Sequence, residues 1–497
     1  MASQPRSSPT RHAVGLLVSV ALLAGCTGDP QTSSTTTSTE ETTAFGPLLA
    51  PNPQLGPAGT ATSHGDSGSS DATPLAGPGT GPIDVARIDV GAVCPSVLIG
   101  SDGLPVALCT RVADVRPVVM LLDPANGQQL ASMEIAPGSL FGGVYGYLDD
   151  ADRMVLVDGN DDLLRISHRV DDGAWALHVD ERVPMAGAIP TDDEVTSVTP
   201  GYDGVVWFAT ADGTVGAVDP DDGSVSTTSL PGDERITNNI SSAPTGTAVA
   251  SDHAVYLFDL DGSGRPVQRW RHAYDRGPAR KPGQLSWGTG STPTFFGPTD
   301  AADYVAIVDN ADPQVHLVVI GVGGDRAGQQ ICAPTVLLEG GAGSENSPIG
   351  AGRTVVVAST YGYQYPRLPD DAGPSQPTSA PFEGGMTRID VRTDGTGCDV
   401  VWNAAVASVA VPKLSTTDGT ILTITRPPDT DGATSTSGPV RYSSTVISAV
   451  DGQVLASREL PADVSDPLQL AGTLGPDRVL YQGTLGTILR ITPRADG

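Results

Sequence analysis

Residues 205–226 read VVWFATADGTVGAVDPDDGSVS and carry the clearest structural signal in the chain. Residues 205–210 form an apolar, β-branched and aromatic run that ends at Asp212-Gly213. A second run, 214–219, ends at Asp222-Gly223. Such runs favour strands, and Asp-Gly between two of them indicates a tight hairpin turn. The stretch therefore predicts antiparallel strands joined by short polar turns.

The same step from strand to turn recurs along the chain, at 121–127, 257–262, 388–395 and 447–452. The chain from residue 82 onward divides into eight such units, which run near 93–137, 142–185, 195–231, 237–272, 287–339, 345–406, 411–461 and 468–493. The last unit shows only three strand patterns, and residues 83–90, which alternate apolar and polar, can supply the fourth. Repeats of this length are typical of β-propeller blades. We therefore predict an all-β protein, a β-propeller of eight four-stranded blades closed by an N-terminal strand, with seven blades as the alternative.

Composition supports this fold class and excludes others. The 497 residues include 60 Gly and 42 Pro, which would break helices repeatedly, while 39% hydrophobic residues are enough for a large core. The formal net charge is −29, with 28 basic and 57 acidic residues. A surface this acidic repels phosphate backbones, so we expect no nucleic-acid partner.

The N-terminus has the features of an export signal. Arg6 and Arg11 precede an apolar run, 13–25, that is too short to span a bilayer as a mature helix. The run ends in Leu-Ala-Gly-Cys at residues 23–26, which resembles a bacterial lipobox. This resemblance implies that residues 1–25 are a lipoprotein signal peptide and that Cys26 carries the lipid, typically palmitate. Cleavage would leave 26 basic and 57 acidic residues, a net charge of −31.

Residues 26–81 are expected to be a disordered tether. Residues 32–43 are almost entirely Thr, Ser and Glu, and 46–82 are rich in Gly, Pro, Ala and Ser. A segment of this composition cannot bury enough apolar surface by itself to offset the entropy lost on ordering. The propeller domain is accordingly assigned to residues 82–497.

Four cysteines remain after Cys26, and an even number in an exported protein favours disulfides. Cys94 and Cys109 fall on adjacent strands of one unit. Cys332 and Cys398 fall on the outer strands of units five and six, which neighbour each other in a propeller. We predict the pairs Cys94–Cys109 and Cys332–Cys398.

The turn pattern at 217–225 resembles the repeat of the quinoprotein-like (PQQ-like) β-propellers. The second half of the chain is similar to a family of uncharacterised actinobacterial secreted propeller proteins, at residues 281–286, 308–313, 345–347 and 412–415. Quinoprotein dehydrogenases hold their cofactor with an adjacent Cys pair, which this sequence lacks. Bound PQQ is therefore not expected.

Polar residues at strand ends form one candidate site. If the blade assignment holds, five oxygen donors face the same mouth of the central channel: Asn239, Asp309, Asn310, Glu345 and Asn346. Carboxylate and amide oxygens suit Ca²⁺. The set is similar by residue type to the calcium site of the paraoxonase and SMP-30-like lactonases, which implies a metal that polarises an ester carbonyl.

These features leave three functions open. The first is a monomeric binding or scaffold module of the cell envelope, held on the outer face of the cell membrane by its lipid, whose partner is an envelope protein or a small ligand. The second is a calcium-dependent hydrolase or lactonase, and the third a quinoprotein dehydrogenase. Because the sequence contains no catalytic triad, the non-catalytic binding module is preferred.

The lipobox gives a direct test. Replacing the acceptor thiol, Cys26→Ala, should release the protein into the medium or leave it unprocessed, because no lipid can then be attached. Fractionation with labelled fatty acid measures both outcomes. Unchanged membrane retention with normal labelling would contradict the assignment.

Overall fold

The computed structural model describes residues 45–138, 145–338, 343–429 and 440–495, which belong to one compact unit. The signal peptide and the lipid-acceptor Cys26 lie outside these residues. No helix within the described ranges is long and apolar enough to cross a bilayer.

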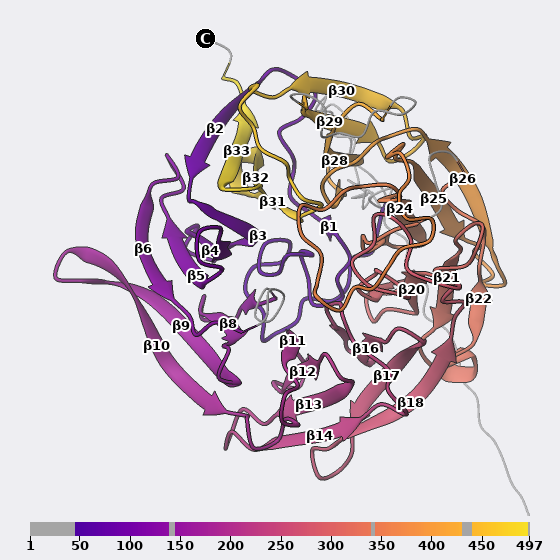
Figure 1. Ribbon diagram of the computed structural model, residues 1–497, viewed down its shortest axis with the longest axis horizontal. Coiled ribbons are helices and arrows are strands. Elements are labelled where there is room, and N and C mark those ends of the chain that lie inside the picture. The colour runs from indigo at the N-terminus through magenta and orange to yellow at the C-terminus, as the bar shows by residue number, and fades with distance from the viewer. Residues whose placement is uncertain (1–44, 139–144, 339–342, 430–439, 496–497) are drawn as a thin grey trace, which may run out of the picture. The chain divides into compact units, whose positions relative to one another are not determined.

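The described chain forms eight four-stranded antiparallel sheets arranged as a ring, so the prediction of an eight-bladed propeller is confirmed (Figure 1). The strands of each blade are given from the innermost outward. Blade 1 consists of β3 (Ala92–Ile99), β4 (Pro105–Arg111), β5 (Pro117–Leu122) and β6 (Gln129–Glu134), and blade 2 of β7 (Tyr147–Leu148), β8 (Met154–Val157), β9 (Asp162–Asp171) and β10 (Ala174–Pro184). Blade 3 consists of β11 (Val195–Pro200), β12 (Val206–Thr210), β13 (Thr214–Val218) and β14 (Val225–Ser229), and blade 4 of β15 (Ser241–Ala243), β16 (Gly246–Ala250), β17 (Ala254–Leu260) and β18 (Pro266–Ala273).

Blades 5 to 7 continue in the same order around the ring. Blade 5 consists of β19 (Thr294–Phe296), β20 (Tyr304–Val308), β21 (Leu317–Gly321) and β22 (Gln330–Cys332). Blade 6 consists of β23 (Ile349–Ala351), β24 (Thr354–Ala358), β25 (Met386–Val391) and β26 (Cys398–Ala404). Blade 7 consists of β27 (Lys413–Ser415), β28 (Thr420–Thr425), β29 (Ser443–Ser448) and β30 (Val454–Glu459). Two short 3₁₀ turns, Gly324–Arg326 and Pro476–Arg478, lie in blades 5 and 8.

The ring closes as predicted, by joining its two ends. Blade 8 contains β31 (Gly472–Gly475), β32 (Val479–Gly483) and β33 (Thr487–Pro493), and its outermost strand is the N-terminal β2 (Ile83–Asp89). β2 pairs antiparallel with β33 over its full length, from Ile83 opposite Pro493 to Asp89 opposite Thr487. In Figure 1 the indigo β2 accordingly lies beside the yellow β33. This pairing joins the two ends of the domain in one sheet, and the propeller as a whole leaves only short strand edges.

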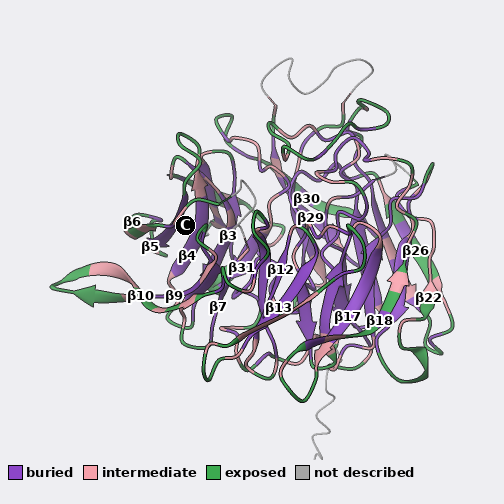
Figure 2. Ribbon diagram, turned by 60° about the horizontal axis from the view of Figure 1, so that its bottom comes forward, coloured by how far each residue is buried: buried purple, intermediate pink, exposed green. Residues whose placement is uncertain are grey.

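The turns that marked the repeat have the backbone geometry their residues predict. Gly213 and Gly223, which end the two runs of blade 3, adopt φ of 85° and 70°. Positive φ is accessible to glycine without a steric cost, so each turn reverses the strand tightly. The turn of the β9–β10 hairpin, at Asp172 and Gly173, also has positive φ, and this hairpin projects from the ring (Figures 1 and 2).

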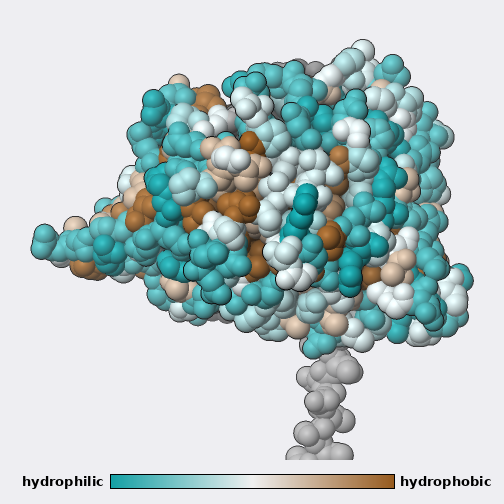
Figure 3. Space-filling model, turned by 90° about the horizontal axis from the view of Figure 1, so that it is seen from below, coloured by the Kyte–Doolittle hydropathy of each residue, from teal (hydrophilic) through white to brown (hydrophobic). Residues whose placement is uncertain are grey.

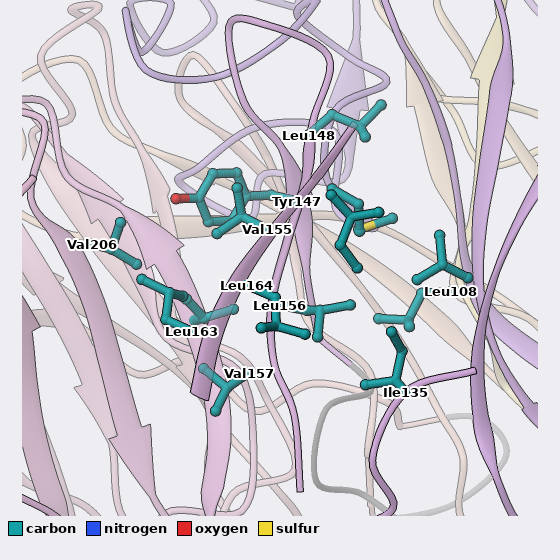
Figure 4. Packing of buried hydrophobic residues seen from close by; sticks show 14 of the residues in the cluster. Leu108, Ile135, Tyr147, Leu148, Val155, Leu156, Val157, Leu163, Leu164 and Val206 are labelled. Atoms are coloured by element: carbon teal, nitrogen blue, oxygen red, sulfur yellow. The ribbon is translucent and has the colours of Figure 1, made fainter. Parts of the chain in front are cut away.

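The core consists of apolar clusters packed between neighbouring blades. The largest joins blades 1, 2 and 3 through side chains such as Leu108, Leu156 and Val206 (Figure 4). Buried residues follow the inner strands, and exposed ones gather in the loops and outermost strands (Figure 2). The face shown in Figure 3 is largely hydrophilic, with hydrophobic residues in small groups.

Two tryptophans fasten outer strands to the next blade. Trp270 of blade 4 packs against Gly328 of blade 5, and Trp402 of blade 6 packs against Gly452 of blade 7. Each indole N–H donates to a carbonyl of that next blade, at 3.0 and 3.1 Å. A Cβ at either glycine would meet the tryptophan side chain at 2.9 Å or less, so the glycine is required by this close approach.

Both predicted disulfides are confirmed. Cys94 and Cys109 join β3 and β4 of blade 1. Cys332 and Cys398 join the outermost strands of blades 5 and 6, with Cα atoms 5.9 Å apart. The second bond therefore adds a covalent link between neighbouring blades at the outside of the ring.

The expectation of a disordered tether is wrong for residues 45–81. Residues 59–73 lie inside the ring and are buried apart from the partly buried Asp66 (Figure 1), and residues 74–81 lead outward to Arg458 on the outermost strand of blade 7. We call residues 45–81 the plug. The compositional argument holds for a segment that must form its own core, but the channel supplies both the burial and the hydrogen-bond partners. Small Gly, Ser, Thr and Ala residues then suit a narrow space.

The plug hydrogen-bonds to one innermost strand after another. Backbone N–H groups at Ile99, Leu148, Ser242, Phe295, Gly350 and Leu414, in blades 1, 2 and 4 to 7, donate to plug carbonyls at 2.7–3.1 Å. In blade 3 the side chain of Asn52 reaches the carbonyl of Pro200 at 2.9 Å. Within the plug, β1 (Ala72–Thr73) pairs parallel with β27 as a fifth strand of blade 7. The plug therefore occupies inner strand edges that would otherwise face an open channel.

A buried ion pair anchors the plug to blade 7. Asp71 is 0% exposed and accepts hydrogen bonds from Lys413 Nζ and, at 2.9 Å, from His64 Nδ1. Lys413 also donates to the carbonyl of Ser63. Removing one partner of a buried pair leaves the other charge uncompensated, which is costly.

Lys413→Met should therefore lower the free energy of unfolding by about 3–5 kcal/mol. Adding Asp71→Asn should recover part of this loss, because the orphaned carboxylate is then gone and Asn tolerates the positive φ of 51° at this position. Urea unfolding of the two variants measures the difference. A double variant less stable than Lys413→Met would contradict the anchoring role.

Candidate functional site

A cavity of about 1070 Å³ lies at one end of the channel. Its lining comes from segments that enter innermost strands, such as 236–238 and 345–347, and from loops between second and third strands, such as 110–112 and 365–374. These are the two kinds of segment that the sequence placed on one face. Ser63 and His64 of the plug complete the lining on the channel side. The cavity is therefore a recess backed by the plug.

Two long loops build much of the wall. One connects β18 to β19 (274–293) and the other connects β24 to β25 (359–385). Arg280 joins them, because its side chain donates to the carbonyls of Gly373 and Gln284 and its own carbonyl accepts from Gln376 N–H at 2.8 Å. A further ion pair, Arg235 to Asp371 at 2.7 Å, ties the second loop to the entry of blade 4.

The mouth of the cavity carries exposed apolar side chains. We call this set the apolar rim, and its members, which are between 36% and 53% exposed, are Val112, Val115, Trp287, Leu368 and Leu485. The guanidinium of Arg276 stacks on the Trp287 ring at 3.7 Å, and the indole N–H donates to the Arg276 carbonyl. These contacts hold the indole in place while its ring stays accessible.

Three side chains that line the cavity have pKa values raised by burial, so each keeps its proton at neutral pH. Burial raises the pKa of Glu345 to about 8, against which a hydrogen bond from Leu285 N–H at 3.0 Å acts. Burial and the Glu345 charge raise the pKa of Tyr145 to about 12. The same causes hold the pKa of Tyr365 well above its ordinary value, and its hydroxyl is buried with no hydrogen-bond partner among the described residues. At neutral pH this region presents neutral hydrogen-bond donors.

His64 faces the cavity from the plug. Its Nδ1 is engaged by Asp71, and Nε2 forms no hydrogen bond within the described part of the chain. The carboxylate fixes the orientation of the ring, so Nε2 is the atom available to a molecule in the cavity.

Only two of the five predicted calcium ligands lie in the cavity lining. Glu345 and Asn346 line the cavity, and Asn346 also donates to Gln469 Oε1 at 3.2 Å. The other three are not part of the cavity lining, and each is engaged in local hydrogen bonds. Asp309 accepts from the backbone and the ring of His316, at 2.7 and 2.9 Å.

The two remaining amides serve to order loops. Asn239 accepts from Ser197 Oγ at 2.9 Å, and Asn310 donates to the carbonyls of Arg276 and Ala279. No group of three or more His, Cys, Asp or Glu side chains within the described ranges is arranged to hold a metal ion. Calcium binding stays a prediction, and its five donors do not share one pocket.

Several cavity residues were not identified from sequence. Arg280, Tyr365 and Trp287 lie in long connecting loops, and His64 lies in the segment interpreted as a tether. The length of the 274–293 and 359–385 loops could have indicated that these segments form a functional site, because long ordered loops in compact domains are often functional.

Comparisons with known proteins describe the fold but not the activity. No family model matches the chain. An uncharacterized protein of Archaeoglobus fulgidus is 31% identical over 132 residues, and the match spans 26% of this chain and 25% of that protein. The quinohemoprotein alcohol dehydrogenase from Comamonas testosteroni is similar in structure, with a TM-score of 0.53 and 11% identity over 90% of this chain and 82% of that one. BamB from Moraxella catarrhalis is more distantly similar in structure, with a TM-score of 0.37 and 11% identity over 69% of this chain and 93% of that one.

The raised pKa of Glu345 predicts how stability depends on pH. The folded protein keeps a proton on Glu345 up to about pH 8, whereas the unfolded chain loses it near 4.5, the ordinary pKa of a glutamate. Stability should therefore fall between these pH values by about 1.4 kcal/mol per pH unit from this group. Glu345→Gln should remove that slope, and the exposed Glu383→Gln should not. Urea unfolding from pH 5 to 8 tests this, and identical profiles for the two variants would refute the assignment.

Proposed function

We propose that the protein is a non-catalytic binding module of the cell envelope whose ligand occupies the cavity. The cavity itself carries the proposal. It is concave, slightly larger than the roughly 300–1000 Å³ typical of ligand sites, and combines an apolar rim with a few convergent polar groups. Its walls are tied together by Arg280 and by the Arg235–Asp371 ion pair, which favours a recess formed before the ligand arrives.

The envelope location rests on the lipobox at residues 23–26 and on two disulfides, which are characteristic of oxidising compartments. The anchored module would present its cavity to ligands outside the membrane. Binding is favoured over calcium-dependent hydrolysis because Asp309, the second carboxylate of that hypothesis, is already held by His316 and lies outside the cavity lining.

The apolar rim makes the binding function testable with a neutral fluorescent probe, N-phenyl-1-naphthylamine. The wild type should bind it saturably at one site, and the bound probe should quench Trp287. The double variant Val112→Gln, Leu485→Gln should weaken binding about tenfold, because two apolar contacts are lost.

A matched control is Val454→Gln with Leu455→Gln. These residues are 53% and 49% exposed on the outermost strand of blade 7, and they are not part of the cavity lining. The control should bind the probe like the wild type. Absence of saturable binding, or equal losses in the two double variants, would contradict a binding cavity.

A further inference from the structure

We propose that the cavity binds an amphipathic carboxylate, with its anionic head at Arg280 and Tyr365 and its apolar body against the rim. This inference rests on the proposed function and names the chemical class of its ligand. Three observations support it independently of each other: the balance of charge in the cavity, the polar groups that lack a charged or hydrogen-bonded partner, and the position of the rim.

The charge of the cavity differs from that of the chain. The lining contains five arginines and five carboxylates, at Arg111, Arg235, Arg276, Arg280 and Arg367 and at Glu194, Asp252, Glu345, Asp370 and Asp371. The whole chain has 28 basic and 57 acidic residues. The lining is therefore balanced in formal charge where the rest of the chain is strongly acidic, so the cavity lacks the surplus of carboxylates that would exclude an anion.

Arg280 is the buried positive charge of this set. It is 6% exposed, and its three side-chain hydrogen bonds go to backbone carbonyls of Gly373 and Gln284. None of its contacts within the described ranges is an ion pair. Carbonyls satisfy the donor geometry of a guanidinium but carry no formal charge, and Glu345, the carboxyl that acts on Arg280 electrostatically, keeps its proton at neutral pH because its pKa is raised to about 8. A carboxylate head would supply the missing negative charge.

The Tyr365 hydroxyl is a hydrogen-bond donor that has no acceptor among the described residues. This hydroxyl is buried and unpartnered in the described structure, which is uncommon because a buried unpaired hydroxyl is costly. Arg280, Tyr365 and Glu345 all line the same cavity, and the Glu345 carboxyl acts on the pKa of each of the other two. A ligand oxygen placed there can accept from the phenol while it pairs with the guanidinium.

The apolar rim sets the shape of the rest of the ligand. Val112, Trp287 and Leu485 come from blade 1, the β18–β19 loop and blade 8, so apolar side chains approach the mouth from several sides. A molecule whose head reaches the buried polar groups must pass these side chains. An apolar body covers them and gains free energy by removing that surface from water.

Displacement of N-phenyl-1-naphthylamine by four ten-carbon ligands that differ in their head groups tests the proposed chemical class of the ligand. Decanoate should displace the probe at about tenfold lower concentration than 1-decanol, and decylamine should be the weakest. Added salt should weaken decanoate but not decanol, because only the anion gains from the arginine. Decyl phosphate distinguishes a carboxylate site from a phosphate site.

Tyr365→Phe is the variant that tests the head-group contact, since the Tyr365 hydroxyl has no hydrogen bond within the described residues to lose. It should weaken decanoate about tenfold, leave decanol unchanged and not lower the melting temperature. Tyr202→Phe, which removes a hydroxyl bonded to the Ala50 carbonyl at 2.6 Å, should cost stability without changing the preference for decanoate.

Equal affinity for decanoate and decanol, preference for decylamine, or a Tyr365→Phe variant that loses both ligands alike would overturn the proposal. Stronger displacement by decyl phosphate would overturn the carboxylate assignment in favour of a phosphate head. If the probe itself does not bind the wild type, the proposed binding function fails, and that result is distinct from all of these.

Discussion

The hydrogen bonds between the plug and the innermost strands are the interaction on which the rest of the structure depends. An inner strand has a free edge along the channel, and buried backbone N–H and C=O groups must find partners. Plug carbonyls accept from inner strands of blades 1, 2 and 4 to 7, and Asn52 reaches blade 3. The plug thus satisfies edges in blades that are far apart in sequence, and it links them across the axis of the ring.

This arrangement also creates the site. With the plug filling the channel, the space at one end becomes a recess, and Ser63 and His64 form part of its wall. The Asp71–Lys413 ion pair fixes the plug where it reaches blade 7, and Asp71 at the same time orients His64 toward the recess. Stability and site geometry therefore share the same buried charges, so a substitution in this cluster affects both.

The distribution of charge gives the recess its chemical character. The chain carries a net charge of −29, yet arginines equal carboxylates in the cavity lining. Several of these arginines are neutralised by ion pairs, as Arg235 and Arg276 are, but Arg280 is bonded only to carbonyls within the described residues. Arg280 lines the same cavity as the Tyr365 hydroxyl, which is unpartnered among the described residues, and as the apolar rim. Polar donors at the bottom and apolar side chains at the mouth define an amphipathic site.

The sequence alone determined the repeat, the closure and the disulfides, because each depends on local pattern. Asp-Gly turns between apolar runs mark hairpins, the alternation at 83–90 marks a half-buried strand, and Cys332 and Cys398 fall on neighbouring outer strands. Only the tertiary structure decided the fate of residues 45–81 and the composition of the cavity. The plug has too little apolar surface to fold by itself, and it is ordered by hydrogen-bond partners on the inner strands of the ring. Likewise Arg280 and Tyr365 lie in loops without periodic pattern, and long-range packing alone brings them together.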